Sequence, residues 1–192
     1  MVLPEMKARQ DGVIIIVSSV GGLKGHGQLG AYCISKAADL QLVRNLAFEK
    51  ILHVNIMANH WLAQLVLPEM KSRKDGVIII VSSVGGLKGH GQLGAYCISK
   101  AADLRLVRNL AFENGPDNIR VNAISPGLIR TDFARALWEN PATLQRRTAN
   151  DPLRRIGEPE EIAGIAVYLA AKSGSFTTGQ NFVIDGGSTI ST

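Results

Sequence analysis

The sequence predicts an α/β fold, a partial doubly wound parallel sheet with helices on both faces. Two short β-branched runs, of which the second is 77–81, do not alternate with polar residues, which is typical of strands buried on both faces. Apolar residues at helical spacing follow over 95–113. A strand at 119–124, a helix from 158 to about 172 and a strand at 182–184 continue the alternation.

Turn-forming residues separate these elements. Asp75 and Gly76 precede the strand 77–81, and the run 114–118 (NGPDN) ends the long helix. Ser125, Pro126 and Gly127 are expected to form a loop after the strand 119–124. The stretch 131–155 is expected to be partly helical and partly irregular.

A nearly perfect internal repeat dominates the sequence. Residues 2–49 recur at 66–113, and 45 of the 48 positions are identical. Repeat arrays usually contain more copies, and those copies have diverged. The pattern is therefore typical of a recent tandem event or a joining accident. We divide the chain into a duplicated strand-loop-helix segment, 1–50, and the C-terminal part of an α/β domain, 51–192.

Composition excludes several classes of protein. The 192 residues are 46% hydrophobic, enough for one substantial core. The net charge of +5 arises from scattered residues, so we expect neither a nucleic-acid nor a membrane-surface partner. The longest aliphatic run has five residues, too few to cross a bilayer. No signal-peptide pattern begins the sequence, which predicts a cytoplasmic protein. No metal site is expected, because Cys and His recur mainly as repeat copies.

Three residues of the second repeat copy could carry acid–base chemistry. Ser83 follows the predicted strand, Tyr96 comes thirteen residues later, and Lys100 lies one helical turn beyond Tyr96. A nearby cation can lower the pKa of a phenol by roughly one to three units. Tyr96 could then exchange a proton near neutral pH, while Ser83 steadies the substrate oxygen. Taken singly, such residues are more often a surface tyrosine, a solvated lysine and a turn serine.

Together these residues belong to a longer pattern. Its segments are VSS at 81–83, GAYCISK at 94–100, RVNAISPG at 120–127, GEPEEIA at 157–163, TGQ at 178–180 and DGG at 185–187. This succession closely resembles the short-chain dehydrogenase/reductase family, and the resemblance covers residues 52–192. It implies a Rossmann-like sheet, oxidoreductase activity, NAD or NADP as cofactor, and a small-molecule alcohol or carbonyl substrate.

The resemblance also implies roles for individual residues. Tyr96 becomes the general acid/base, Lys100 tunes it and holds the nicotinamide ribose, and Ser83 orients the substrate. Asn55, which stands 28 residues before Ser83, completes the family's catalytic tetrad. The alternative for Asn55 is a polar residue in the first turn of a helix.

A second group of residues matches the family's Pro-Gly-x-x-x-Thr loop, which contacts the nicotinamide carboxamide. Its members are Pro126, Gly127, Ile129 and Thr131. Phe133, Leu137 and Trp138 fall where the family has a mobile substrate lid, and Phe133 is the candidate substrate contact. The alternative for these three is the apolar face of a short amphipathic helix.

One glycine motif is misleading. The stretch 85–91 (GGLKGHG) has the Gly-x-x-x-Gly-x-Gly spacing of a dinucleotide site. We interpret it instead as a loop bordering the substrate site, because it follows Ser83 directly and no second strand with an acidic residue comes after it. The family's own cofactor fingerprint is missing from this sequence, so much of the expected pyrophosphate-binding energy has no visible source.

The copied segment suggests how the shortened sheet could be completed. The strand 13–17 could pair beside 77–81, or chains could assemble into a homo-oligomer. The copied helix could continue into the next one as a single rod, because 29–67 contains only Gly30 and no Pro. The spare Ser19, Tyr32 and Lys36 are expected to be inert.

The leading hypothesis is an NAD(P)-dependent oxidoreductase that interconverts an alcohol and a ketone, with cofactor binding impaired by the missing motif. The alternative is a non-catalytic fragment that retains only oligomer-assembly surfaces. In the resembling family, the helices that begin near Asn55 and Tyr96 commonly pack against partner subunits.

Overall fold

The computed structural model describes residues 13–17, 48–91 and 93–191. The copied helix and the spare Ser19, Tyr32 and Lys36 lie outside this range. Residues 48–52 are helical and lead without a break into the helices that follow. The predicted rod is therefore continuous past Lys50, and its earlier part falls outside the described residues.

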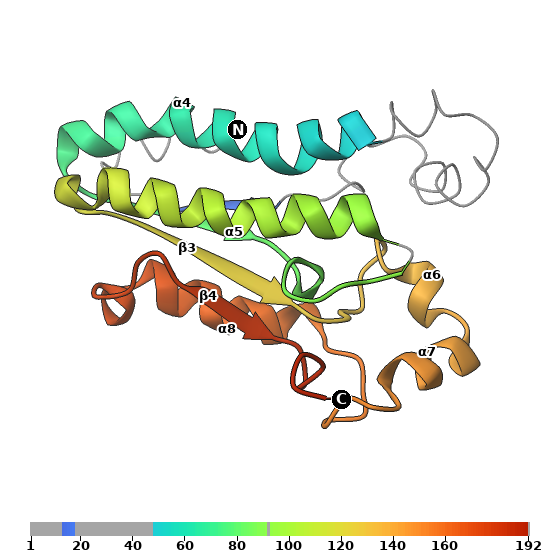
Figure 1. Ribbon diagram of the computed structural model, residues 1–192. Helices are drawn as coiled ribbons and strands as arrows, with labels where there is room; N and C mark the ends of the chain where they lie inside the picture. Colours follow the sequence, from blue (N-terminus) through green and yellow to red (C-terminus); the bar gives the residue numbers. More distant parts are fainter. Residues whose placement is uncertain (1–12, 18–47, 92, 192) are drawn as a thin grey trace.

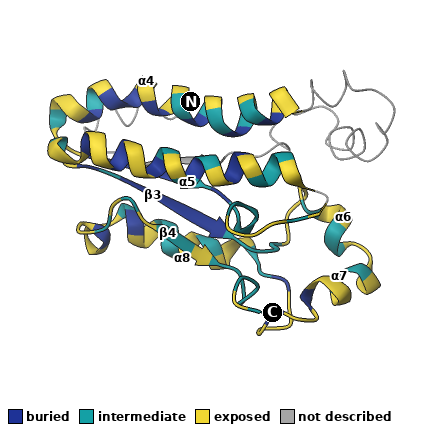
Figure 2. Ribbon diagram, in the orientation of Figure 1, coloured by how far each residue is buried: buried dark blue, intermediate teal, exposed yellow. Residues whose placement is uncertain are grey.

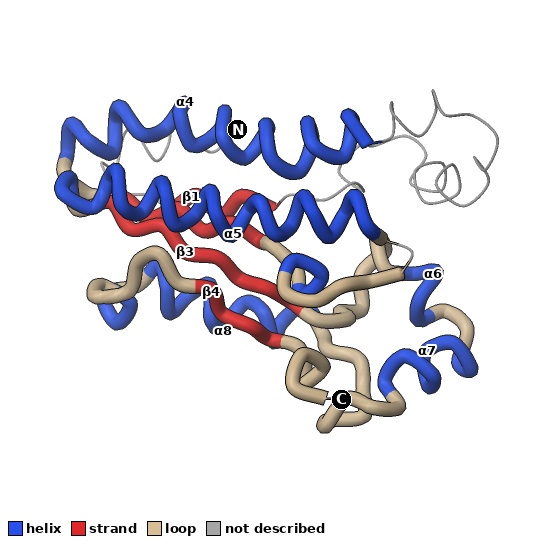
Figure 3. The backbone as a smooth tube through the Cα atoms, in the orientation of Figure 1, coloured by secondary structure: helices blue, strands red, loops and turns tan. Residues whose placement is uncertain are grey.

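The sheet has four parallel strands in the order β1-β2-β3-β4. They are β1 (Val13–Val17), β2 (Gly76–Val81), β3 (Ile119–Pro126) and β4 (Asn181–Ile184). Strand β1 pairs with β2 in register, from Val13 opposite Val77 to Val17 opposite Val81. The prediction that the copied strand joins the retained sheet is thus confirmed in the structure (Figure 3).

Helices cover both faces of this sheet, as the sequence predicted (Figure 1). A π-helical turn, η2 (His53–Met57), leads into α4 (Ala58–Arg73), which lies beside α5 (Gly94–Asn114) on one face. Helix α8 (Pro159–Ala170) lies on the other face. The short helices α6 (Arg135–Trp138) and α7 (Pro141–Thr148) lie beyond the carboxyl end of β3. Three 3-10 turns complete the described part: η3 (Val84–Gly86), η4 (Gly115–Asp117) and η5 (Lys172–Gly174).

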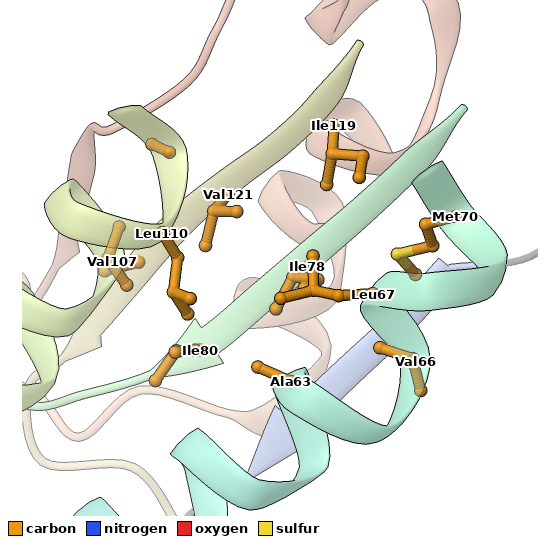
Figure 4. Close-up of a cluster of buried hydrophobic side chains, with 12 residues drawn as sticks. Ala63, Val66, Leu67, Met70, Ile78, Ile80, Val107, Leu110, Ile119 and Val121 are labelled. Carbon is orange, nitrogen blue, oxygen red and sulfur yellow. The ribbon is translucent and has the colours of Figure 1, made fainter. Parts of the chain in front are cut away.

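Strand β2 shows why its sequence is apolar without alternation. Ile78 and Ile80 pack into the core shared with α4 and α5 (Figure 4). Val77 and Ile79 face the opposite way and join Leu169 of α8 in a second core. Successive residues of a strand point to opposite faces, so a strand covered on both sides needs apolar residues throughout.

The expected loop at Ser125 and Pro126 was wrong, because both residues belong to β3. They pair with Val183 and Ile184 of β4, and the Ser125 hydroxyl donates to Asn181 Oδ1 at 2.7 Å. Pairing with β4 overrides the local turn preference, and Pro126 is the last residue of the strand. The loop therefore begins at Gly127.

Within the described ranges, no helix combines the length and apolar character that a membrane crossing requires.

Candidate active site

Ser83 stands where β2 ends and the chain turns toward α5. The Ser82 amide still donates to Ile124 O of β3, at 2.7 Å, which holds the strand end in place. Ser83 then precedes η3, and its hydroxyl accepts a hydrogen bond from Gly85 N at 3.0 Å. The Ser83 side chain thereby points from the carboxyl end of a parallel strand, where open α/β sheets bind ligands.

Tyr96 meets Ser83 from the first turn of α5. The two side chains are hydrogen-bonded. A β-carbon at Gly85 would lie 3.3 Å from Tyr96 Cε1 and 3.4 Å from Ser83 Oγ, so the glycine lets the loop lie closely over both residues. Sequence spacing predicted this convergence, and the structure brings the two hydroxyl groups together.

Lys100 lies one turn along α5 and is 1% exposed. Its ammonium is 5.9 Å from the centroid of the Tyr96 ring. It donates to Val81 O at 3.0 Å and contacts Asp103 Oδ2 at 3.2 Å. The lysine is therefore held at the end of β2, next to the Tyr96 ring.

The pKa of the Tyr96 phenol is raised, not lowered as the sequence predicted. Burial raises the pKa of Tyr96, the hydrogen bond from Ser83 acts against that rise, and the charges of Cys97 and Asp103 add to it. The predicted net lowering of the Tyr96 pKa was wrong, because burial of the phenol is the largest effect on it. The Lys100 ammonium lies over the ring, 5.9 Å from its centroid, and its charge is paired with the Asp103 carboxylate. A pKa raised above its ordinary value favours the protonated phenol of Tyr96 at neutral pH.

Asn55 is fully buried in the π-helical turn η2. Its amide donates to Ser99 Oγ at 2.9 Å, and the Ser99 hydroxyl donates to Tyr96 O at 2.7 Å. The turn lies within a continuous helical stretch from residue 48 to 73, so the alternative of a first-turn polar residue does not fit. Asn55 instead contacts α5 between Tyr96 and Lys100.

Sequence reasoning missed three buried polar residues that support this site: Asn59, Ser99 and Asp103. The Asn59 amide donates to Asn55 O at 2.7 Å and to Asp103 Oδ1 at 2.9 Å. Helical spacing was the available signal, because Asn59 is four residues after Asn55 and Asp103 three after Lys100. Asn59 and Asp103 thus lie on the same helix faces as Asn55 and Lys100 and are hydrogen-bonded to each other.

The stretch that follows β3 lies next to the end of β4. Gly127 N donates to Ile184 O at 2.9 Å, and a β-carbon at Gly127 would come within 2.8 Å of Asp185 Cα. Ile129 then forms an isolated parallel bridge with Gly157. The two hydrogen bonds of that bridge use Arg130 N and Leu128 O, so the amide and carbonyl of Ile129 itself point away from Gly157.

Phe133 reaches the same region, with its ring 6.5 Å from that of Tyr96. It is 54% exposed. The indole of Trp138 donates to Thr131 O at 2.9 Å, which ties α6 to the stretch after β3. In α7, Arg147 lies 3.1 Å from the His90 ring nitrogen and bridges to the glycine-rich loop.

The glycine-rich loop lies against the candidate active site. A β-carbon at Gly86 would lie 2.7 Å from the Lys100 carbonyl carbon, so η3 and α5 are in backbone contact. The loop leads into α5 and then into β3. Among the residues at 48–91 and 93–191, no cluster of three or more His, Cys, Asp or Glu side chains could hold a metal ion.

Comparison with known proteins agrees with this geometry. Residues 47–189 match the family described as "Enoyl-(Acyl carrier protein) reductase", and residues 1–50 match the family described as "short chain dehydrogenase". The chain belongs to the short-chain dehydrogenase/reductase family. Both of its segments therefore match families of this group.

Curated relatives of the chain include mammalian and bacterial members of the family. Dehydrogenase/reductase SDR family member 4 of Bos taurus is 46% identical over 141 residues, which are 73% of this chain and 50% of the relative. The 7alpha-hydroxysteroid dehydrogenase of Escherichia coli is 37% identical over 140 residues, which are 73% of this chain and 54% of the relative. The chain thus spans about half the length of the curated relatives it matches.

Solved structures show the same fold. A 7 alpha-hydroxysteroid dehydrogenase complexed with NADH and 7-oxo glycochenodeoxycholic acid matches with a TM-score of 0.77 and 32% identity, over 92% of this chain and 63% of that one. A 4-hydroxyisoleucine dehydrogenase complexed with NADH also matches with a TM-score of 0.77, at 30% identity, over 100% of this chain and 74% of that one. The chain therefore shares the α/β fold of these proteins over the part that it covers.

The link through Ser99 yields a stability prediction. Ser99→Ala removes two hydrogen bonds of the Ser99 hydroxyl, one with the Asn55 amide and one with Tyr96 O, so the free energy of unfolding should fall by about 1–3 kcal/mol. Urea unfolding followed by circular dichroism measures this change. The matched control is Ser173→Ala, an exposed serine whose hydroxyl bonds Tyr168 O at 3.4 Å, which should change stability by less than about 0.5 kcal/mol. Equal stability of the two variants would contradict the buried link.

Proposed function

We propose that this chain is an NAD(P)-dependent oxidoreductase that interconverts an alcohol and a ketone, with Tyr96 as the general acid/base. The observation that carries the proposal is the meeting of Ser83, Tyr96 and Lys100 at the carboxyl end of β2. Names of the relatives support the same class of reaction, because they are dehydrogenases or reductases. They do not favour a purely structural fragment.

Proton transfer falls to Tyr96. In the reducing direction its phenol donates a proton to the carbonyl oxygen, and the Ser83 hydroxyl stabilises the charge developing on that oxygen. Lys100 stabilises the tyrosinate that remains. Because burial raises the pKa of Tyr96, the donor form is present at neutral pH. Reduction should therefore be lost as the pH rises through that pKa, while oxidation, which needs the tyrosinate, should increase.

The nicotinamide cofactor supplies or accepts the hydride when it is bound. The residues present fit its nicotinamide end. Ile129 presents a peptide amide and carbonyl that its bridge to Gly157 does not use, and these groups match the needs of a carboxamide. We propose that Pro126, Gly127, Ile129 and Thr131 bind there, that Tyr96 and Lys100 hold the adjoining ribose, and that Phe133 and Ser83 contact the substrate.

The pyrophosphate end has weaker support. The only Gly-x-x-x-Gly-x-Gly stretches of the sequence are 85–91 and its repeat copy 21–27, and the first lies against Tyr96 and Lys100. We therefore propose that the chain binds the cofactor more weakly than relatives that carry a separate glycine motif.

Cofactor titration tests the proposal first. NADH and NADPH are added separately while nicotinamide fluorescence is followed, and we expect saturable binding of at least one with a dissociation constant below about 1 mM. Binding of one cofactor only would also assign the preference. No saturation with either cofactor at millimolar concentration would contradict the proposal.

Turnover tests the role of Tyr96. Ketone reduction is assayed on a panel that includes 7-oxo glycochenodeoxycholic acid, the ligand of the solved hydroxysteroid dehydrogenase. Tyr96→Phe removes the donated proton, so kcat should fall by about 10²–10⁴-fold with nearly unchanged cofactor affinity. The repeat supplies a matched control, Tyr32→Phe, which should leave the rate unchanged. If Tyr96→Phe retained the rate of the unmodified chain, the assignment would be wrong.

We further propose that the chain forms a homo-oligomer through α4 and α5. Their outer sides are exposed and carry large apolar side chains, with Leu65 66% and Phe112 88% exposed (Figure 2). Burying these side chains against a second copy would be favourable.

Sedimentation velocity tests this assembly. We expect a dimer or larger species, and Leu65→Glu should weaken association at least about tenfold by placing a charge in the interface. Lys172→Glu, an exposed change on η5, serves as the control. A monomeric chain, or equal effects of the two changes, would exclude this surface.

A further inference from the structure

Buried between α4 and α5 lies a carboxylate that the proposed reaction does not itself require. Asp103 is 0% exposed. One of its oxygens contacts Lys100 Nζ at 3.2 Å, and the other accepts from Asn59 Nδ2 at 2.9 Å. Both oxygens thus have charged or polar partners inside the protein, which is the condition under which a buried carboxylate can remain ionised.

Lys100 has an equally restricted environment. Its ammonium contacts a carboxylate on its own helix and the Val81 carbonyl at the end of β2. Burial lowers the pKa of Lys100, while the charge and the hydrogen bond of Asp103 oppose that effect. Burial likewise raises the pKa of Asp103, and Lys100 and Asn59 oppose it. Each partner therefore favours the charged form of the other.

We propose that Asp103 is a positioning residue of this site: its carboxylate holds the Lys100 ammonium at the end of β2 and compensates its charge next to the Tyr96 ring. Asn59 extends this function, because its amide joins Asp103 to the carbonyl of Asn55. The π-helical turn that carries Asn55 is thereby connected to the charge pair. This inference rests on the proposed function of Tyr96 and Lys100.

Several described elements pack around this pair. Helix α5 contributes Tyr96 and Cys97. The charges of Cys97 and Asp103 both raise the pKa of Tyr96, and burial raises the pKa of Cys97. Uncharged groups of the described elements also lie around the pair: Asn55 and Asn59 from η2 and α4, the Val81 carbonyl of β2, and Ser82 and Ser83 before η3. Asp103 is the carboxylate that forms an ion pair with Lys100, at 3.2 Å.

Removing the charge of Asp103 has a predictable sign. Without a buried anion, the protonated forms of both Lys100 and Tyr96 become less favourable, so each group loses its proton at a lower pH. Ketone reduction needs the Tyr96 proton and the Lys100 charge. In Asp103→Asn the alkaline limb of the kcat/KM profile for reduction should therefore move to lower pH. A residue that only filled space would lower the rate without moving this limb.

The repeat provides a matched control and the glutamate variant a rescue. Asp39 is the equivalent residue of the first copy, and Asp39→Asn should leave both the rate and the profile unchanged. Asp103→Glu keeps the anion and should restore the limb at least partly. An unmoved limb in a folded Asp103→Asn variant, or equal shifts in the Asp39 and Asp103 variants, would overturn the proposal.

A second readout does not depend on turnover. Chains labelled with ¹³C at lysine Cε and tyrosine Cζ are titrated by NMR, with Lys100→Met and Tyr96→Phe to assign the signals. We expect the titration midpoints of Lys100 and Tyr96 to fall in Asp103→Asn.

If Asp103→Asn does not fold, the unmodified chain is titrated instead, and protonation of Asp103 should shift the Lys100 signal. Unchanged midpoints, or a Lys100 signal that does not shift when Asp103 is protonated, would overturn the inference even if the chain reduced ketones. Shifted midpoints in a chain that reduces no ketone would refute only the proposed function.

Discussion

The ammonium of Lys100 is 1% exposed, and a charge in that position must find partners inside the protein. Removing an ion from water costs several kcal/mol, which only close and well-oriented partners offset. Here the partners come from different elements: Val81 ends β2 and Asp103 lies on α5. Asn59 of α4 donates a hydrogen bond to the other oxygen of the Asp103 carboxylate. The position of Lys100 therefore constrains how these three elements pack together.

That packing also determines the geometry of the proposed chemistry. The backbone of η3 contacts α5 at Gly86, and the same approach brings Ser83 to Tyr96. Because the lysine charge is compensated and the phenol is buried, the resting tyrosine keeps its proton. In the proposed reaction, this protonation state favours the donation of a proton during reduction. Oxidation requires the proton to leave first, which higher pH favours.

Much of this arrangement could be predicted from sequence. The uniformly β-branched run of β2 required cover on both faces, and α4, α5 and α8 provide it. Ser83 at a strand end and Tyr96 at a helix start were expected to meet, and they do. The copied strand was expected to pair beside β2, and its in-register pairing follows from a sequence identical to that of β2 over 13–17.

Other features depend on tertiary contacts that local patterns do not encode. Helical spacing showed that Asp103 shares a face with Lys100, but not that this face is buried against Asn59. For the same reason the pKa of Tyr96 was misjudged, since its burial and the compensating carboxylate were both unknown. The π-helical turn at 53–57 contains neither Gly nor Pro to mark it. Finally, Ser125 and Pro126 carry turn preferences that pairing with β4 overrides.

The most direct test of the buried charge is the hydrogen-exchange rate of the Lys100 ammonium, measured by ¹⁵N NMR on the intact chain at neutral pH. Hydrogen bonds to Val81 and Asp103 within the protein predict a resonance that exchanges far more slowly than those of exposed lysines such as Lys71 and Lys172. An ammonium that exchanges as rapidly as these surface groups would place Lys100 in solvent and contradict the account.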